Sequence, residues 1–384
     1  MHVLVIGAGP GGAAAAIELA RGGADVRVVE KARWPRAKTC GDGISPPGVC
    51  EARALGVALD DKRPLPMGEI STPCGIRFRG GWRAETPWGA IVERREFDER
   101  LMQAAVAAGA GFETGVAVAE LVADRRGPRA TFRRGSSTQA GSRPQQFDAV
   151  VLAEGATGGL AFKAGFGRHR TRLVALRGYA FSRVPLAPQF GLYFDRGVSP
   201  GYGWIFPVDE RRANVGILVG ERAARVHGGD LRGMLRDWTR VSAAAGETVG
   251  PAPDYESLSG GVIPTGRRLR ARSGMYLVGD AAGVADPFSA EGIYQAMASG
   301  RAAAAALLAM GPGRAAERHY ARALRPFDRN AAEAYRLRLG FGYVIDFLGA
   351  RAVKRPELAH HLSSSGFFMK ESLTQFLWGI VRTW

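Results

Sequence analysis

Cysteine is scarce in this chain of 384 residues. Its three cysteines are Cys40, Cys50 and Cys74, and neither their odd number nor their spacing is typical of a disulfide framework or of a set of metal ligands. We therefore expect no structural disulfide and no metal site, and cysteine usage favours a reducing compartment.

Long hydrophobic runs are lacking as well. No run approaches the roughly 18 apolar residues that a membrane-spanning helix needs. The first expected strand begins at residue 2, which leaves no room for a signal peptide before it. These features predict a cytoplasmic protein, with peripheral contact with the inner face of the membrane as a further option.

Lysine is rare although the chain is strongly basic. Six of the 52 basic residues are lysine, and the formal net charge is +16. The arginines are scattered and form no basic helix with interleaved aromatic residues, so we expect no nucleic-acid partner. An anionic membrane surface or an anionic substrate is a better match for this charge.

The most informative segment lies at the start of the chain. Residues 2–6 are an apolar run typical of a buried strand, and Gly7, Gly9 and Gly12 follow at the GxGxxG spacing. A strong helix-forming segment comes next, and its N-terminus is expected to face a pyrophosphate. A second strand then ends at Glu30, a carboxylate suited to a ribose without a 2′-phosphate. This order predicts a binding site for FAD or NAD rather than NADP.

The middle of the chain is richer in strands. Residues 31–50 are rich in glycine and proline and are expected to form a loop, whereas residues 97–110 are expected to form a helix. Residues 112–134 alternate as in an antiparallel hairpin, and residues 172–220 contain several strands separated by turns. Residues 231–246 predict a helix packed against that second group of strands.

The end of the chain is expected to be helical. From residue 275 onward a short strand, a glycine turn and a long alanine-rich helix follow one another. The last stretch, residues 366–384, is rich in aromatic and aliphatic side chains. It is expected either to pack on the body of the protein or to contact a membrane.

Three motifs resemble the FAD fingerprints of the flavoprotein superfamily that includes glutathione reductase and p-hydroxybenzoate hydroxylase. They are GAGPGG at residues 7–12 together with Glu30, AEGATG at residues 153–158, and LVGDAAG at residues 277–283. The resemblance implies FAD as the cofactor, and it implies that Asp280 holds the ribityl chain.

The same resemblance implies how the flavin end is built. Arg94 is expected near the flavin or its phosphates. The loop from Pro287 to Ile293 is expected to run under the isoalloxazine ring, with the N–H groups of Gly292 and Ile293 at the N1–C2=O edge. The full set of expected cofactor-binding residues is Gly7, Gly9, Gly12, Glu30, Lys31, Cys40, Gly41, Arg94, Gly155, Gly279, Asp280, Pro287, Gly292 and Ile293.

The implied fold class is α/β, or α+β overall. It has a Rossmann-like FAD-binding domain with three layers, a second substrate domain built on an antiparallel β-sheet, and a helical C-terminus. We assign residues 1–60, 90–170 and 265–310 to the FAD-binding domain, residues 61–89 and 171–264 to the substrate domain, and residues 311–384 to the helical region.

Two further motifs narrow the resemblance. RAKTCGDGISP at residues 36–46 resembles the R-x-K-x-C-G-x-G segment of the geranylgeranyl reductase family, and GYGWIFP at residues 201–207 resembles that family's Y-x-W-x-F-P segment. Flavin-dependent halogenases carry G-W-x-W-x-I-P at the position of the second motif. This chain has Tyr202 in place of the first tryptophan and Phe206 in place of the isoleucine, which counts against halogenation. The resemblance therefore implies an FAD-dependent reductase that saturates C=C bonds of a polyprenyl chain, such as a geranylgeranyl group or a quinone tail.

Such a reaction needs a proton donor and aromatic side chains. An isolated alkene must accept a proton at one carbon before hydride from N5 of reduced flavin can reach the other. Cys40, Asp42 and Tyr202 are the motif residues that could donate the proton, and Tyr202 with Trp204 could stabilise the cation. We therefore count Cys40, Asp42, Tyr202 and Trp204 as the expected catalytic residues. Arg36 and Lys38 could bind FAD phosphates, an anionic head group or only solvent.

Several alternatives stay open. The chain has one dinucleotide fingerprint, so electrons are expected from NAD(P)H without a dedicated domain, from a ferredoxin or from free reduced flavin. The main hypothesis is a prenyl reductase with a lipid-like substrate. A second is an FAD monooxygenase or halogenase that modifies an aromatic or polyketide metabolite, and a third is a flavin-binding or membrane-surface protein without turnover.

Overall fold

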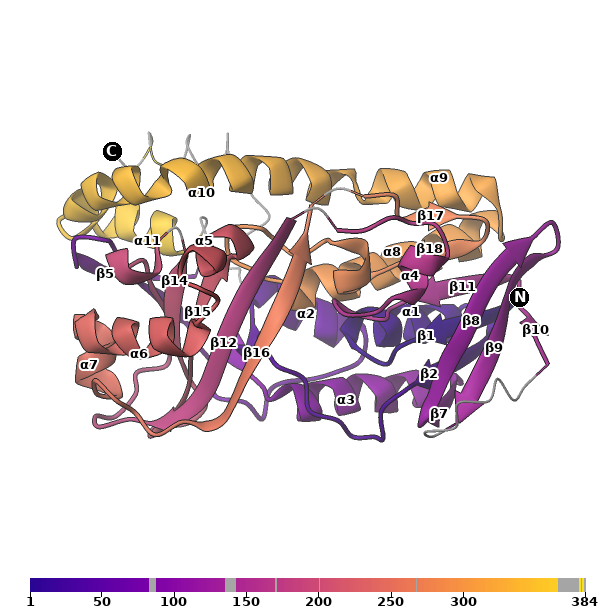
Figure 1. The fold of residues 1–384 in the computed structure, drawn as a ribbon, viewed down its shortest axis with the longest axis horizontal. Helices are drawn as coiled ribbons and strands as arrows, with labels where there is room; N and C mark the ends of the chain where they lie inside the picture. Colours follow the sequence, from indigo (N-terminus) through magenta and orange to yellow (C-terminus); the bar gives the residue numbers. More distant parts are fainter. Residues whose placement is uncertain are drawn as a thin grey trace.

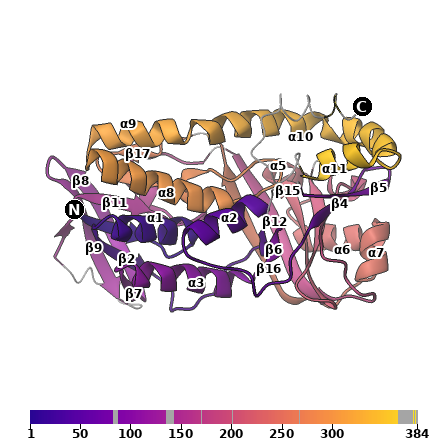
Figure 2. The same cartoon turned by 180° about the vertical axis from the view of Figure 1, so that it is seen from behind.

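Two large β-sheets organise the structure, and helices lie along their outer faces and one common edge (Figures 1 and 2). The computed structural model describes residues 1–82, 88–134, 143–169, 171–199, 201–266, 268–364, 380 and 382, with the backbone alone for 333–344 and 363–364. Much of the aromatic stretch at residues 366–384 lies outside the described residues.

The first sheet has six strands and carries the N-terminal motif. Its four central pairings are parallel, and the short edge strand β17 is antiparallel. The strand order is β17 (Ala271–Arg272), β18 (Met275–Leu277), β11 (Ala149–Leu152), β1 (His2–Ile6), β2 (Asp25–Glu30) and β7 (Gly111–Thr114). The predicted sequence of strand, glycine turn, helix and strand is confirmed by β1, α1 (Pro10–Arg21) and β2.

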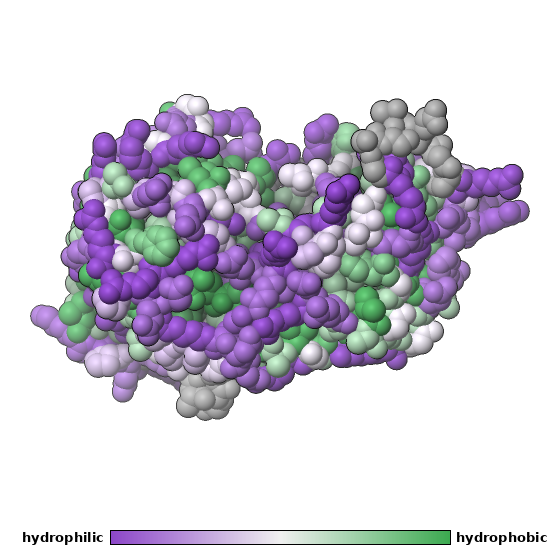
Figure 3. Space-filling model, turned by 90° about the horizontal axis from the view of Figure 1, so that it is seen from below, coloured by the Kyte–Doolittle hydropathy of each residue, from purple (hydrophilic) through white to green (hydrophobic). Residues whose placement is uncertain are grey.

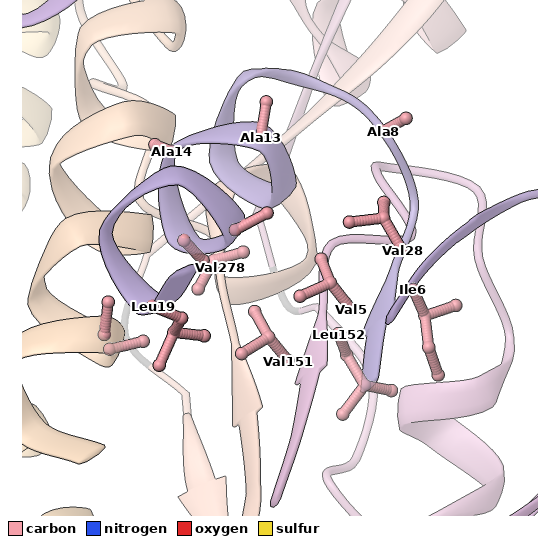
Figure 4. Close-up of a cluster of buried hydrophobic side chains, with 14 of the residues drawn as sticks. Val5, Ile6, Ala8, Ala13, Ala14, Leu19, Val28, Val151, Leu152 and Val278 are labelled. Carbon is pink, nitrogen blue, oxygen red and sulfur yellow. The ribbon is translucent and has the colours of Figure 1, made fainter. Parts of the chain in front are cut away.

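This sheet is the middle of three layers. The small alanine side chains of α1 let the helix lie close to the sheet. Leu19 and Ala14 of the helix belong to the same buried cluster as Val5 and Val151 of the sheet (Figure 4). The helices α3 (Arg94–Ala107) and α8 (Ile293–Met310) contact α1 on this side. The opposite layer is a three-stranded antiparallel sheet of β8 (Val116–Asp124), β9 (Gly127–Arg134) and β10 (Gln145–Gln146).

The expectation for residues 112–134 was partly wrong. The hairpin is present as β8 and β9, but residues 111–114 form β7 and extend the parallel sheet beside β2. Gly115, with φ of +68°, separates the two parts, because this left-handed conformation lets the chain leave one sheet for the other.

The second sheet has seven strands. Its order is β16 (Glu256–Thr265), β12 (Thr171–Phe181), β15 (Arg212–Gly220), β14 (Tyr202–Pro207), β13 (Gln189–Tyr193), β4 (Met67–Ser71) and β5 (Arg77–Gly81). The expected antiparallel pairing holds except between β13 and β4, which are parallel. A parallel pair needs a long crossover, and more than a hundred residues separate these two strands in the sequence.

Helices cover one face of this second sheet. The expected single helix at residues 231–246 is two helices, α6 (Leu231–Val241) and α7 (Ala243–Thr248), beside α5 (Glu221–Val226). The break is at Ser242, whose hydroxyl accepts a hydrogen bond from the Ala245 N–H at 3.4 Å and caps the second helix.

The expected loop at residues 31–50 also contains regular structure. Gly43–Ile44 forms the short strand β3, which pairs with β6 (Ala90–Ile91), and α2 (Pro46–Ala54) follows at once. Ser45 caps α2 by accepting a hydrogen bond from the Gly48 N–H at 3.2 Å, and Pro46 occupies the first turn. A serine followed by a proline is a signal for the start of a helix. The loop prediction missed it because it rested on the high glycine and proline content of the segment.

Three helices, α9 (Arg314–Ala323), α10 (Arg325–Ala352) and α11 (Pro356–Ser364), confirm a helical C-terminal region. In both ribbon views α9 and α10 run along one edge of the molecule and pass both sheets (Figures 1 and 2). Among the described residues, no helix has the length and apolar character needed to cross a membrane. Figure 3 shows the underside of the molecule as it is oriented in Figure 1. This face is mainly hydrophilic, with apolar groups between the hydrophilic side chains.

Short elements complete the description: α4 (Leu160–Lys163), and the 3-10 turns η1 (Arg196–Val198) and η2 (Gly279–Ala282). The strands of the six-stranded sheet lie in the segments assigned to the FAD-binding domain. Those of the seven-stranded sheet lie in the segments assigned to the substrate domain, apart from Thr265 at the end of β16. The domain boundaries themselves stay a prediction.

Candidate functional site

A cavity of about 590 Å³ lies between the two large sheets. On one side it is lined by residues directly after β1, β2, β11 and β18, and on the other by side chains of the seven-stranded sheet. Ligands in open α/β sheets bind at the carboxyl ends of parallel strands, and this volume is typical of a small-molecule site. We call it the main cavity.

The glycine turn after β1 forms the end of the main cavity suited to a pyrophosphate. A Cβ on Gly7 would lie 2.3 Å from the Ala153 carbonyl oxygen, and one on Gly12 would lie 2.0 Å from the Gly7 carbonyl oxygen, so both positions require glycine. Gly9 has no such contact and caps α1 without a side-chain hydrogen bond. The free N–H groups at this helix end therefore remain available to an anion, which fits FAD.

Glu30 lies at the edge of the same turn and is 5% exposed. Its carboxylate accepts hydrogen bonds from the backbone N–H of Ala8 at 3.1 Å and of Ala32 at 3.0 Å. It therefore fixes the glycine turn as well as lining the main cavity, and Lys31 lines the cavity beside it.

Two arginines flank Gly9. The guanidinium of Arg94 forms a bidentate pair with Asp98 at 2.8 and 2.9 Å, and Arg36 donates to the same carboxylate at 2.9 Å. Burial lowers the pKa of Arg94, but the Asp98 carboxylate raises it above its usual value, so Arg94 stays charged. One buried carboxylate thus holds two cations near the expected phosphates.

Asp98 was missed by sequence reasoning. It is fully buried in α3 and stands four residues after Arg94, on the same face of the helix. The RREFD segment, residues 94–98, contains this four-residue spacing, which could have indicated the Arg94–Asp98 pair in advance.

The expected flavin end is formed by loops after β11 and β18. Gly155, Gly279, Asp280, Gly292 and Ile293 all line the main cavity. The N-terminus of α8 opens toward the cavity at Gly292 and Ile293, which suits a group that gains negative charge. Pro287 differs, because it lines a separate cleft described below.

The CGDG segment, residues 40–43, lies over the seven-stranded sheet. It places two of the expected catalytic residues, Cys40 and Asp42, in different surroundings. Cys40 and Gly41 line the main cavity, and burial raises the pKa of the Cys40 thiol above its ordinary value of 9.0. The thiol is therefore protonated at neutral pH, as a proton donor must be. Asp42 is fully buried and is not part of the cavity lining.

Asp42 instead belongs to a buried hydrogen-bond network. Its carboxylate accepts from the Tyr179 hydroxyl at 2.6 Å and from the Asn214 amide at 2.8 Å. Asn214 also donates to the Cys40 carbonyl at 3.0 Å and accepts from the Trp204 indole N–H at 3.0 Å. The network ties the Cys40 segment to β14 and β15, and burial raises the pKa of Asp42.

An aromatic wall forms the sheet side of the main cavity. Tyr202, Trp204 and Phe206 alternate along β14 and therefore share one face of the strand, which lines the cavity. The Tyr202 hydroxyl donates to the Ser289 carbonyl of the expected flavin loop. Neighbouring strands add Phe190 and Leu192, which sequence reasoning did not select.

Arg177 is a second functional candidate that sequence reasoning missed. It lies in β12, lines the main cavity and is 7% exposed. It donates to the Ser257 carbonyl at 3.2 Å and lies over the Tyr179 ring, 4.6 Å from its centroid. Among the described residues no carboxylate lies within salt-bridge distance of it, so the wall combines apolar rings with one cation.

Known proteins resemble this chain in sequence and in structure. Residues 1–329 match the family described as FAD binding domain. Menaquinone reductase of Mycobacterium tuberculosis is 32% identical over 320 residues, which cover 79% of this chain and 75% of that protein. Digeranylgeranylglycerophospholipid reductase 1 of Methanopyrus kandleri is 33% identical over 319 residues, which cover 78% of each.

Solved structures show the same fold. A geranylgeranyl bacteriochlorophyll reductase-like protein from Thermoplasma acidophilum has a TM-score of 0.82 at 21% identity and covers 100% of this chain and 96% of its own. A flavin-dependent brominase has a TM-score of 0.78 at 17% identity, with coverage of 100% and 99%.

Proposed function

This chain belongs to the FAD binding domain family and, within it, to the geranylgeranyl reductase family of FAD-dependent oxidoreductases. We propose that it saturates C=C bonds in the polyprenyl chain of a lipid-like substrate. The relatives named above are a menaquinone reductase and a digeranylgeranylglycerophospholipid reductase, which supports a lipid-like substrate. The observation that carries the proposal is the apolar, aromatic wall of the main cavity opposite the glycine turn.

The proposed roles begin with the cofactor. Gly9, the N-terminus of α1, Arg36 and Arg94 hold the phosphates, Glu30 holds the adenosine ribose, and Asp280 holds the ribityl chain. Reduced FAD held by these residues would supply a hydride to the substrate.

Cys40 is the proposed proton donor. Its thiol gives a proton to one alkene carbon, and the cationic charge develops on the other carbon, which the hydride then reaches. The thiolate regains its proton from solvent, so the net change is the addition of H⁺ and H⁻ across one C=C bond. The faces of Trp204 and Phe206 stabilise the cation and exclude water.

Asp42 and Tyr202 act as positioning residues in this proposal. Asp42 accepts hydrogen bonds behind the cavity wall, and the Tyr202 hydroxyl proton is directed to the Ser289 carbonyl. A substrate of this kind resides in a bilayer, so the proposal includes peripheral contact with a membrane surface.

An anaerobic product assay tests the proposal. The FAD-loaded protein, reduced with dithionite, is incubated with a prenylquinone, a digeranylgeranyl phospholipid and geranylgeranyl diphosphate, and products are analysed by mass spectrometry. We expect a gain of two hydrogens per reduced bond for at least one substrate, and none with protein stripped of FAD. No such product from any of the three classes would overturn the proposal, as would products that gain oxygen or halogen only in air.

A further inference from the structure

A second concave site lies next to the main cavity. It is a cleft of about 1410 Å³ between Arg268–Ala271, which leads from β16 of the seven-stranded sheet into β17 of the six-stranded sheet, and the adjoining faces of α9 and α10. Thr171, Thr265, Gly266 and Pro287 also line it. We call it the arginine cleft, and its volume exceeds the roughly 300–1,000 Å³ of a site for a drug-sized ligand.

The arginine cleft carries excess positive charge. Arg268, Arg270, Arg325 and Arg329 line it, and the acidic residue in the lining is Asp328. Asp328 pairs with Arg270 at 2.8 Å. Within the described part of the chain, the other three guanidinium groups have no carboxylate at salt-bridge distance.

The surroundings of Arg268 show the same excess. Arg268 donates to the His169 ring at 2.7 Å and to the backbone carbonyls of Ala281, Gly167 and Phe166 at 2.9, 2.8 and 3.3 Å, all of which are neutral acceptors. Burial and, after it, the nearby cations Arg268, Arg172 and Arg270 together lower the pKa of His169 to about 4. The histidine stays uncharged at neutral pH, so Glu154 is the carboxylate whose charge acts on Arg268.

The helical side of the arginine cleft is built by sequence spacing. Arg325, Asp328, Arg329 and Ala332 follow at positions i, i+3, i+4 and i+7 and therefore share one face of α10. They lie in the first turns of a helix of 28 residues, where the helix dipole adds to the positive potential.

Thr265 connects the cleft to the main cavity. Its side chain is 2% exposed, lines the cleft and has a hydroxyl without a hydrogen-bond partner among the described residues. Gly261 and Ile263 of the same strand line the main cavity. Pro287 makes a similar link, because Ser289 of the same loop lines the main cavity. A ligand in the cleft would lie beside the expected flavin end.

We propose that the arginine cleft binds the phosphate groups of an organic phosphate ligand, with Arg325 and Arg329 from α10 as the charged contacts. Guanidinium groups bind phosphate oxygens in a bidentate manner, and the apolar Leu269 and Pro287 can cover a ring or chain beside them. Two sources share this chemistry: a nicotinamide dinucleotide that reduces FAD, and a phospholipid head group. The use of the ligand rests on the proposed function, whereas its binding does not.

Binding to the FAD-loaded protein tests the proposal. The ligands are NADPH, NADH, inorganic pyrophosphate, and phosphatidylcholine vesicles with and without phosphatidylglycerol. The variant Arg325→Glu/Arg329→Glu reverses two cleft charges. The control Arg318→Glu/Arg322→Glu makes the same change of net charge on exposed residues of α9 outside the cleft lining.

We expect the cleft variant to raise the Kd of at least one dinucleotide or of the anionic vesicles by about tenfold or more, with the control close to wild type. Pyrophosphate should compete with that ligand. A dinucleotide effect identifies the reductant as the source, and a vesicle effect identifies the lipid. Reduction of the bound FAD by dithionite should be equal in all variants, which separates this result from a failure of prenyl reduction. Equal losses in the cleft variant and the control, or binding of no phosphate ligand by the wild type, would overturn the proposal.

Discussion

Cys40 and Asp42 stand two residues apart, and a single backbone conformation gives them different surroundings. Asp42 has a φ of +61°, a left-handed conformation that is uncommon outside glycine and asparagine. This turn leaves Cys40 in the lining of the main cavity, while the Asp42 carboxylate meets Tyr179 and Asn214. The motif predicted a site at this segment, but it could not predict which side chain faces the cavity, because that depends on hydrogen bonds from distant strands.

Replacement of the thiol tests the proposed proton donor. Cys40→Ala should lower the rate of product formation by at least about a hundredfold, since general acid catalysis contributes roughly 10²–10⁴. FAD content should stay close to wild type. The pKa of the thiol is raised above 9.0, so wild-type activity should persist to alkaline pH and fall only as the pH rises through that higher pKa.

The matched control is Cys50→Ser, because Cys50 is an exposed cysteine on the neighbouring helix α2. It should keep the wild-type rate and pH profile. A Cys40→Ala enzyme with full activity and an unchanged alkaline limb would show that Cys40 only fills space.

At the scale of one element, β14 has two faces with different tasks. Tyr202, Trp204 and Phe206 line the main cavity, whereas Gly203 faces the helical layer, where a Cβ would lie 2.1 Å from the Trp238 ring. The motif predicted that Tyr202 and Trp204 act together, and their two-residue spacing along the strand places both on one face. The sequence could not show that α6 covers the other face, nor that β4 pairs in parallel with β13, because both depend on contacts between remote segments.

Substitution of Trp204 tests the aromatic wall. Trp204→Leu should lower kcat by about 2–30-fold, because a desolvated cation loses roughly 0.5–2 kcal/mol of cation–π stabilisation. Trp204→Phe should retain part of that rate. Both variants leave the Asn214 oxygen without the indole donor, so both should lose about 1–3 kcal/mol of unfolding free energy.

Ile205→Val on the other face of β14 separates chemistry from stability. Ile205 is 4% exposed, and the change should cost about 0.5–1.5 kcal/mol of unfolding free energy without lowering kcat. If both Trp204 variants kept the wild-type kcat while losing stability, the ring would be a packing residue only.

At the scale of the whole molecule, the main cavity exists because segments from residue 6 to residue 296 meet between two sheets. The glycine turns that line it were predictable, since each follows a strand and carries its own local motif. Arg177 and Asn214 were not, because they act through partners more than sixty residues away. The spacing of Arg94 and Asp98 was present in the sequence, but the contact of Asp98 with Arg36 joins residues 62 positions apart.

The same architecture predicts how cofactors stabilise the protein. FAD at about 100 times its Kd should add roughly 2.7 kcal/mol to the unfolding free energy and raise Tm. FMN should raise Tm much less, because it lacks the adenosine half that Glu30 and the N-terminus of α1 are placed to hold. Thermal unfolding at one fixed scan rate, with each flavin at equal concentration, measures the difference.

Variants in β2 assign that effect to the expected ribose site. Glu30→Gln keeps one of the two oxygens that accept from the backbone N–H groups of Ala8 and Ala32 and removes the charge, so it should reduce the Tm increase caused by FAD. Asp25→Asn on the same strand should not, because the Asp25 side chain is 81% exposed and is not part of the cavity lining. Equal stabilisation by FMN and FAD, with no difference between the two variants, would mean that the N-terminal glycine turn does not hold the adenosine end of the cofactor.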